Sequence, residues 1–153
     1  MNQVSAVEPI VRLQEVELTF KSDAGEINIL RGIDLSVWKG ESVGVVGPSG
    51  SGKTSMIMVI AGLEQVSSGR VSVAGWEISA LAEDSLAEFR RDNVGVVFQS
   101  FHLVPTMTAH ENVAVPMELA GRADAFERAA EVLAEVGLAE RFKHYPGQLS
   151  GGE

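Results

Sequence analysis

Apolar and polar positions alternate in several short runs over the first hundred residues, which is the pattern of half-buried strands. Alternation predicts strands over residues 11–20 and 33–37, with Ser, Asp and Gly in a turn over residues 21–26. The first run changes phase near Gln14, where a bulge would restore the inward face. The two strands should therefore each present one apolar face to a common core.

Two other runs, residues 43–46 and 94–98, are apolar almost throughout. Continuous apolar runs of this length are typical of strands whose two faces are both buried in a parallel sheet. Residues 71–73 and 76–78 flank Ala74-Gly75 and predict a hairpin. The first part of the chain is thus predicted to combine antiparallel strands with a buried parallel sheet.

Helical patterns dominate after residue 98. Thr108 and Glu111 have the spacing of a capping box, and Pro116 should kink or interrupt the helix that they begin. A later stripe of apolar residues predicts a packed helix face, formed by Phe126, Ala129, Ala130, Leu133 and Val136. The predicted helices span residues 52–63, with Gly62 as its cap, 84–91, 108–120 and 124–136.

Composition narrows the function classes. The chain has 153 residues, enough for one domain, and 12 basic against 21 acidic residues give a net charge of −9. Nucleic-acid binders usually present a basic face, so no nucleic-acid partner is expected. There is no Cys, which excludes a thiolate metal site. No secretory signal is visible, and the most apolar stretch, residues 56–63, is too short to cross a bilayer.

A glycine-rich motif between a predicted buried strand and a predicted helix indicates phosphate binding. Glycines permit backbone angles at which successive amides point inward at an anion, and the following helix adds its positive end. Lys53 can reach the β and γ phosphates, and the Thr54 hydroxyl can bind Mg²⁺. The alternative is a simple glycine-rich turn. The motif G-x-x-x-x-G-K-[ST] is formed by Gly47, Pro48, Ser49, Gly50, Ser51, Gly52, Lys53 and Thr54.

A second motif at the other end of the sequence makes the class more specific. It resembles the LSGGE/LSGGQ signature of the ATP-binding cassette (ABC) family, and Gln99 follows the strand predicted at 94–98, where that family carries its Q-loop glutamine. The three motifs occur in the family's order along essentially the whole chain. The signature residues are Leu149, Ser150, Gly151, Gly152 and Glu153.

The resemblance implies an α/β fold, namely a P-loop NTPase core with an antiparallel β subdomain and an α-helical subdomain. Residues 1–98 would form the β subdomain and P-loop core, residues 99–148 the Q-loop and helical subdomain, and residues 149–153 the start of the signature. The cofactors would be ATP, bound by the P-loop, Ser55 and Gln99, and Mg²⁺, held by Thr54 and Gln99. Phe20 lies where the family stacks an aromatic ring on adenine, which is the role favoured here; the alternative is that this strand Phe is simply a core residue.

The family also implies partners. A second ATP-binding subunit would pair head to tail, so that the signature of one subunit closes over ATP on the other. Residues 98–116 resemble the ATPases of lipoprotein-release and macrolide-export systems, which implies a membrane permease as partner and a peripheral position on the cytoplasmic face of the membrane. The expected function is to couple ATP binding and hydrolysis to that permease, for export or release of a substrate.

Further expectations concern the missing part of the domain, the alternative functions and the three histidines. The family's Walker B carboxylates would follow residue 153, so no catalytic residue is assignable in this sequence. The carboxy-terminal part of the domain is therefore expected to be missing. For the same reason, the chain alone should not hydrolyse ATP. One alternative function is a nucleotide-binding fragment without turnover. Another is a non-transport ABC ATPase of DNA repair or chromosomes, which would have a long coiled coil between the Q-loop and the signature. The segment from Gln99 to Leu149 has no sustained heptads, which argues against that second alternative. The dispersed histidines suggest no metal site; His110 and His144 should be solvated and His102 should lie in a partner-facing loop.

Overall fold

The computed structural model describes residues 8–22, 25–98 and 102–152. Contacts within the chain divide it into two compact units, Met1–Val96 and Val97–Glu153. Each unit has its own packed interior, so each is described by itself. The phosphate-binding motif belongs to the first unit and the signature residues to the second.

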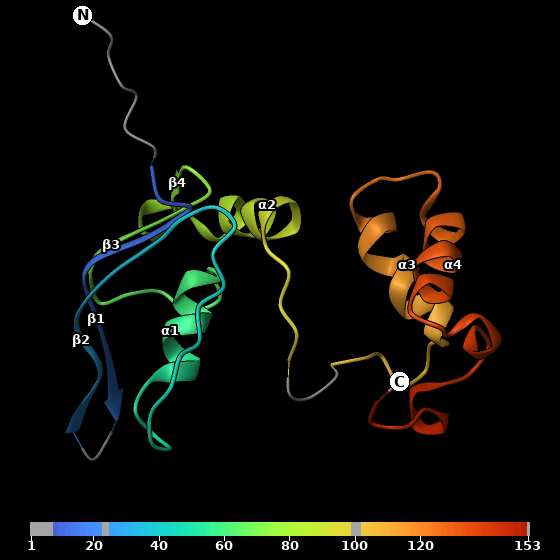
Figure 1. The fold of residues 1–153 in the computed structure, drawn as a ribbon, viewed down its shortest axis with the longest axis horizontal. Helices are drawn as coiled ribbons and strands as arrows, with labels where there is room; N and C mark the ends of the chain where they lie inside the picture. Colours follow the sequence, from blue (N-terminus) through green and yellow to red (C-terminus); the bar gives the residue numbers. More distant parts are fainter. Residues whose placement is uncertain (1–7, 23–24, 99–101, 153) are drawn as a thin grey trace, which may run out of the picture. The chain divides into compact units, whose positions relative to one another are not determined.

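The first unit contains an antiparallel sheet with strand order β2-β1-β3-β4. The strands are β1 (Val11–Ser22), β2 (Gly25–Val37), β3 (Ser68–Val73) and the short β4 (Trp76–Glu77) (Figure 1). The predicted hairpin over 71–78 is confirmed, because β3 and β4 pair across the turn at Ala74-Gly75. The turn predicted over 21–26 is wrong at both ends, because cross-strand pairing continues to Ser22 and resumes at Gly25.

The predicted bulge near Gln14 is confirmed. The pairing of β1 with β2 shifts register between Leu13 and Val16, and Glu15 has a left-handed φ of 48°. This irregularity lets both Leu13 and Val16 face inward although they are three positions apart. Both side chains are fully buried. The phase change seen in the sequence therefore has a backbone cause.

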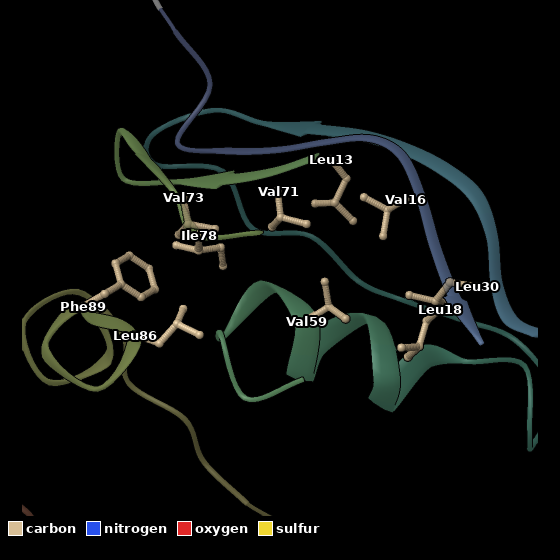
Figure 2. Packing of buried hydrophobic residues seen from close by; sticks show 10 residues of the cluster. All are labelled: Leu13, Val16, Leu18, Leu30, Val59, Val71, Val73, Ile78, Leu86 and Phe89. Carbon is tan, nitrogen blue, oxygen red and sulfur yellow. The ribbon is translucent and has the colours of Figure 1, made fainter. Parts of the chain in front are cut away.

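Two helices accompany this sheet: α1 (Lys53–Ile60) and α2 (Glu83–Asn93), the latter preceded by a 3-10 turn, η1 (Ile78–Ala80). Figure 2 shows Val59 of α1 and Phe89 of α2 turned toward the side chains of the strands. Gly62 ends α1 as predicted, because the Gly62 and Leu63 amides donate to the carbonyls of Val59 and Met58, the Schellman pattern. The core consists of Leu13, Val16, Leu18, Leu30, Val59, Val71, Val73, Ile78, Leu86 and Phe89.

The strands expected at 43–46 and 94–98 are not formed. A strand requires a neighbouring strand to accept and donate its backbone hydrogen bonds, and no described strand pairs with either segment. The exposure of their apolar side chains is uneven: Val46 is 91% exposed and Val97 is fully exposed, whereas Val94 is partly buried against the core. The prediction of a buried parallel sheet is therefore wrong for the described residues.

The second unit is a pair of helices, α3 (Ala109–Leu119) and α4 (Ala125–Glu135), followed by 3-10 turns η2 (Ala139–Arg141) and η3 (Pro146–Gln148). The capping box is present: the Glu111 amide donates to the Thr108 hydroxyl, and the Thr108 amide donates to the Glu111 carboxylate. These contacts hold the pKa of Glu111 below its usual range, mainly through the Thr108 backbone N–H.

The structure refines two details of the helix predictions. Pro116 does not interrupt α3, which runs from Ala109 to Leu119, because a proline removes one backbone bond while the neighbouring bonds remain; the kink expected there stays a prediction. The buried face of α4 includes Ala125, which the stripe omitted, whereas Phe126 and Val136 of the stripe are 44% and 65% exposed. Val136 ends the helix, and the chain turns there at Gly137. In the part of the chain that the structure describes, no helix is both long and apolar enough to cross a bilayer.

Candidate functional site

The glycine-rich loop enters α1 through a left-handed residue. Gly52 is the N-cap of α1 and has φ 87°, a conformation that side-chain-bearing residues rarely adopt. A Cβ added there would lie 2.9 Å from the backbone oxygen of Ile29. Gly52 is therefore required both for its backbone angle and for the close approach of β2. The amides of the first turn of α1 have no partner within the helix, and the dipole of the helix favours an anion beside them.

These residues line a pocket of about 260 Å³. Its wall consists of Ile29 and the continuous segment 49–55, which includes the Lys53, Thr54 and Ser55 side chains at the start of α1. No Asp or Glu lines this pocket, so nothing acidic in its wall repels a phosphate. The arrangement has the chemistry of an anion site: backbone amides, hydroxyls and one ammonium group.

Lys53 lies across the loop. Its Nζ donates to the backbone oxygens of Gly47 at 3.0 Å and Pro48 at 2.6 Å. The loop is also closed on itself, because the Ser51 amide donates to the Pro48 carbonyl at 3.3 Å. The ammonium group is thus held over the loop by two carbonyls and keeps one N–H for a further acceptor.

Phe20 lies near the end of β1, opposite Ile27 of β2. Its side chain is 43% exposed, so the reading of Phe20 as a buried core residue does not hold. Ile29, two residues along β2 from Ile27, lines the pocket formed with segment 49–55. The first unit therefore brings an exposed aromatic ring and the glycine-rich loop to the same two strands.

Sequence reasoning did not identify Ile29 as a pocket residue. Its neighbours on β2 alternate weakly, and Ile29 belongs to no motif. The strand pairing does not mark it either, because the cross-strand partner of Phe20 is Ile27, and Ile29 falls at a register shift between the pairs Leu18–Leu30 and Thr19–Asn28. A motif search cannot recover such a residue, since its place in the pocket depends on the close approach of β2 to Gly52.

The signature residues lie in the second unit. Leu149 ends the η3 turn with its amide donating to the Pro146 carbonyl at 3.2 Å, and Gly151-Gly152 form a turn and not a helix. Gln99 and Glu153, both predicted site residues, lie outside the described residues. Among the residues that are described, no three His, Asp or Glu side chains group as a metal site.

The geometry and the motifs agree with a comparison to known proteins. The family model described as "ABC transporter" matches residues 30–153, which is most of the chain. The chain belongs to the ABC transporter family. The expected α/β fold is confirmed at the level of the family, because this ABC chain also resembles solved cassettes.

Among its relatives, the ABC chain is 46% identical to a lipoprotein-releasing system ATP-binding protein, LolD, of Novosphingobium aromaticivorans. It is 45% identical to a macrolide export ATP-binding/permease protein, MacB, of Marinobacter nauticus. Each match covers 95% of this chain, but it spans 66% of the LolD protein and 23% of the MacB protein. The predicted resemblance to ATPases of these two kinds of system is thus borne out. A methionine import ATP-binding protein, MetN, of Brucella abortus is also 42% identical over 95% of this chain, and the chain corresponds to part of the length of all three relatives.

A dimeric ATP-binding cassette in a post-hydrolysis state, bound to ADP and Pi, is similar in structure. The TM-score is 0.85 at 39% sequence identity, over 93% of this chain and 64% of the other. At this sequence identity, the similarity supports membership of the same family as well as a shared fold.

Proposed function

We propose that this chain is the ATP-binding part of an ABC transporter, which binds Mg-ATP in the pocket at the start of α1. The observation that carries the proposal is the pocket lined by Ile29 and segment 49–55, which contains no Asp or Glu. Gly52, in the left-handed conformation, begins α1 in this pocket, and Lys53 is one of the lining residues. Triphosphate oxygens would replace the carbonyl contacts of Lys53 and accept from the first-turn amides of α1.

The residues fit Mg²⁺ as well as ATP. The Thr54 hydroxyl lines the pocket, and hydroxyl, amide-oxygen and phosphate oxygens are ligands that Mg²⁺ accepts. Thr54 and Gln99 would hold the ion, and the ion would neutralise charge on the β and γ phosphates. Ser55 and the loop residues Gly47, Pro48, Ser49, Gly50, Ser51 and Gly52 would position the phosphates.

The proposed assembly is a head-to-tail pair of ATP-binding subunits attached to a membrane permease at the cytoplasmic face. The signature, residues 149–153, would close over ATP bound by the partner subunit. The dimeric state of the similar cassette supports the pairing, and the lipoprotein-releasing and macrolide-export relatives support a role in substrate release or export. We assign residues 1–98, 99–148 and 149–153 to the core, the helical subdomain and the signature, respectively.

Replacing Phe20 tests the adenine platform. We expect Phe20→Ala to weaken Mg-ATP binding about fivefold to 150-fold, the range that corresponds to an aromatic–base stack of about 1–3 kcal/mol. Binding of inorganic triphosphate should stay the same, because that ligand has no base to stack. Titration calorimetry with both ligands measures the difference.

Ile10→Ala is the matched control for Phe20→Ala, because Ile10 is another partly exposed apolar residue of the first unit and does not line the pocket. Its affinities for both ligands should equal those of the unchanged chain. Equal losses of ATP and triphosphate affinity in Phe20→Ala would show that Phe20 supports the fold and not the base.

Turnover should require more than this pocket. Hydrolysis needs a carboxylate that orients the attacking water, and no Asp or Glu lines the pocket. We therefore expect the polypeptide 1–153 to bind Mg-ATP while releasing phosphate at less than about 0.1 per second, below the usual enzymatic range. Phosphate release is compared with that of Lys53→Ala as the baseline. Release well above that baseline would mean that one of the chain's own carboxylates serves the reaction.

A further inference from the structure

His110 lies between two aromatic rings at the start of α3. Its imidazole stacks on Phe142, with ring centroids 5.3 Å apart and an interplanar angle of 17°. It also meets the ring of Phe126 of α4 edge to face, again at 5.3 Å. His110 is therefore only partly solvated, because the second unit places two phenyl rings against its imidazole.

The contact to α4 fixes the ring. His110 Nε2 lies 2.7 Å from the backbone oxygen of Phe126. A carbonyl oxygen only accepts, so Nε2 carries the proton and donates. The imidazole is thus held by one hydrogen bond and two ring contacts, and it joins α3, α4 and the segment at Phe142.

Backbone hydrogen bonds also connect the start of α3 to the segment at Phe142. The Ala109 amide donates to the His144 carbonyl at 2.8 Å, and the His110 amide donates to the Phe142 carbonyl at 3.1 Å. Both amides belong to the first turn of α3, where no partner exists within the helix. The segment 142–144 therefore supplies the hydrogen-bond acceptors for these two amides. We name the contacts of residues 109–110 with 126, 142 and 144 the α3 junction.

The α3 junction is continuous with the signature residues. Directly after His144, the Tyr145 amide donates to the Gln148 side chain at 2.9 Å and the Gln148 amide donates back to the Tyr145 carbonyl at 2.8 Å. Leu149 follows, with its amide bonded to Pro146. Between the junction and Leu149 there are thus only four residues, and local hydrogen bonds order them.

The same helix end also holds the loop that follows Gln99. Asn112 of α3 accepts the Val104 amide through Oδ1 at 2.7 Å. Its Nδ2 lies within hydrogen-bonding distance of the carbonyls of Val104, Met107 and Thr108. The first turns of α3 therefore contact both the chain leading out of Gln99 and the chain leading into the signature.

We propose that His110 is a positioning residue, which acts through the Phe142 ring to hold the signature residues in the orientation needed for the partner subunit's ATP. The role rests on the proposed function, because the signature matters only if two chains pair around ATP. The imidazole touches neither nucleotide nor metal in this role. Its part is to fix the segment 142–149 on the helix pair.

Three variants separate the contacts of the imidazole. His110→Ala removes both the stack and the donor, His110→Phe keeps a ring between the two phenyls, and His110→Gln keeps a donor at the position of Nε2. We expect hydrogen exchange of the Gln148 and Leu149 amides to accelerate about threefold to tenfold in His110→Ala, the range expected for loss of an aromatic pair. His110→Phe should restore most of the protection, and His110→Gln should restore little.

Two further readouts distinguish positioning from general loosening. Exchange of the Leu133 amide in α4 should stay unchanged in all three variants. Mg-ATP affinity should also stay unchanged when it is measured at a protein concentration too low for pairing, because the pocket belongs to the other unit. ATP-dependent pairing of the chains, measured by sedimentation with Mg-ATP, should weaken in His110→Ala and recover in His110→Phe.

Unchanged exchange at Gln148 and Leu149 in His110→Ala would overturn the inference, and so would an equal acceleration at Leu133. Unchanged pairing despite faster exchange would also overturn it, since the signature would then not depend on the junction. Failure of the unchanged chain to bind or pair with ATP would refute the proposed function instead. The two failures are distinguishable, because the exchange comparison needs no nucleotide.

Discussion

Lys53→Ala is expected to weaken Mg-ATP binding about tenfold to a hundredfold. A charge-assisted hydrogen bond contributes about 1.5–3 kcal/mol, and Lys53 holds the only ammonium group among the side chains that line the described pocket. The loss should also relax the loop, because Nζ now bonds to the Gly47 and Pro48 carbonyls. Titration calorimetry with Mg-ATP measures the affinity.

The matched control is Lys39→Ala, which removes the same charge from the first unit at a turn that does not line the pocket. Its affinity should stay within about twofold of the unchanged chain, because exposed charges at a distance are screened by salt. Circular dichroism of both variants verifies that the fold is kept. Unchanged affinity in Lys53→Ala would remove the basis for placing phosphates in this pocket.

Gly69→Ala is expected to destabilise the first unit by roughly 2–6 kcal/mol. Gly69 has φ 89°, and a Cβ there would lie 2.4 Å from the backbone oxygen of Glu15 and 2.7 Å from that of Gln14. These atoms form the bulge of β1, which cannot withdraw without disturbing the pairing with β3. Left-handed strain costs about 1–3 kcal/mol and overpacking about 1–3 kcal/mol more. Urea unfolding followed by tryptophan fluorescence measures the loss, since both tryptophans, Trp38 and Trp76, lie in this unit.

Gly75→Ala separates the two causes. Gly75 has a similar φ of 83°, but a Cβ there would meet nothing within 4 Å. Its variant should lose only the strain, about 1–2 kcal/mol. Equal losses of unfolding free energy at positions 69 and 75 would show that the bulge moves aside, and that the close approach of β1 and β3 is not a constraint on the fold.

Local signals in the sequence were sufficient wherever one residue sets its own backbone. Thr108 and Glu111 begin α3 because their side chains bond to each other's amides, and Gly62 ends α1 because it adopts a left-handed angle. The phase change near Gln14 located the bulge for the same reason. The phosphate loop was recognisable because its glycines and Lys53 are needed within a single short segment, whatever the rest of the chain does.

Tertiary structure decided everything that depends on a neighbour. Residues 43–46 and 94–98 have the composition of buried strands, yet they form none in the described chain, because a strand requires another strand for its hydrogen bonds. Ile29 lines the pocket wall only because β2 passes close to Gly52 of the loop. His110 is partly buried because α4 and the segment at Phe142 fold against α3. Such roles arise from contacts between segments far apart in the sequence, and so no pattern along the chain could predict them.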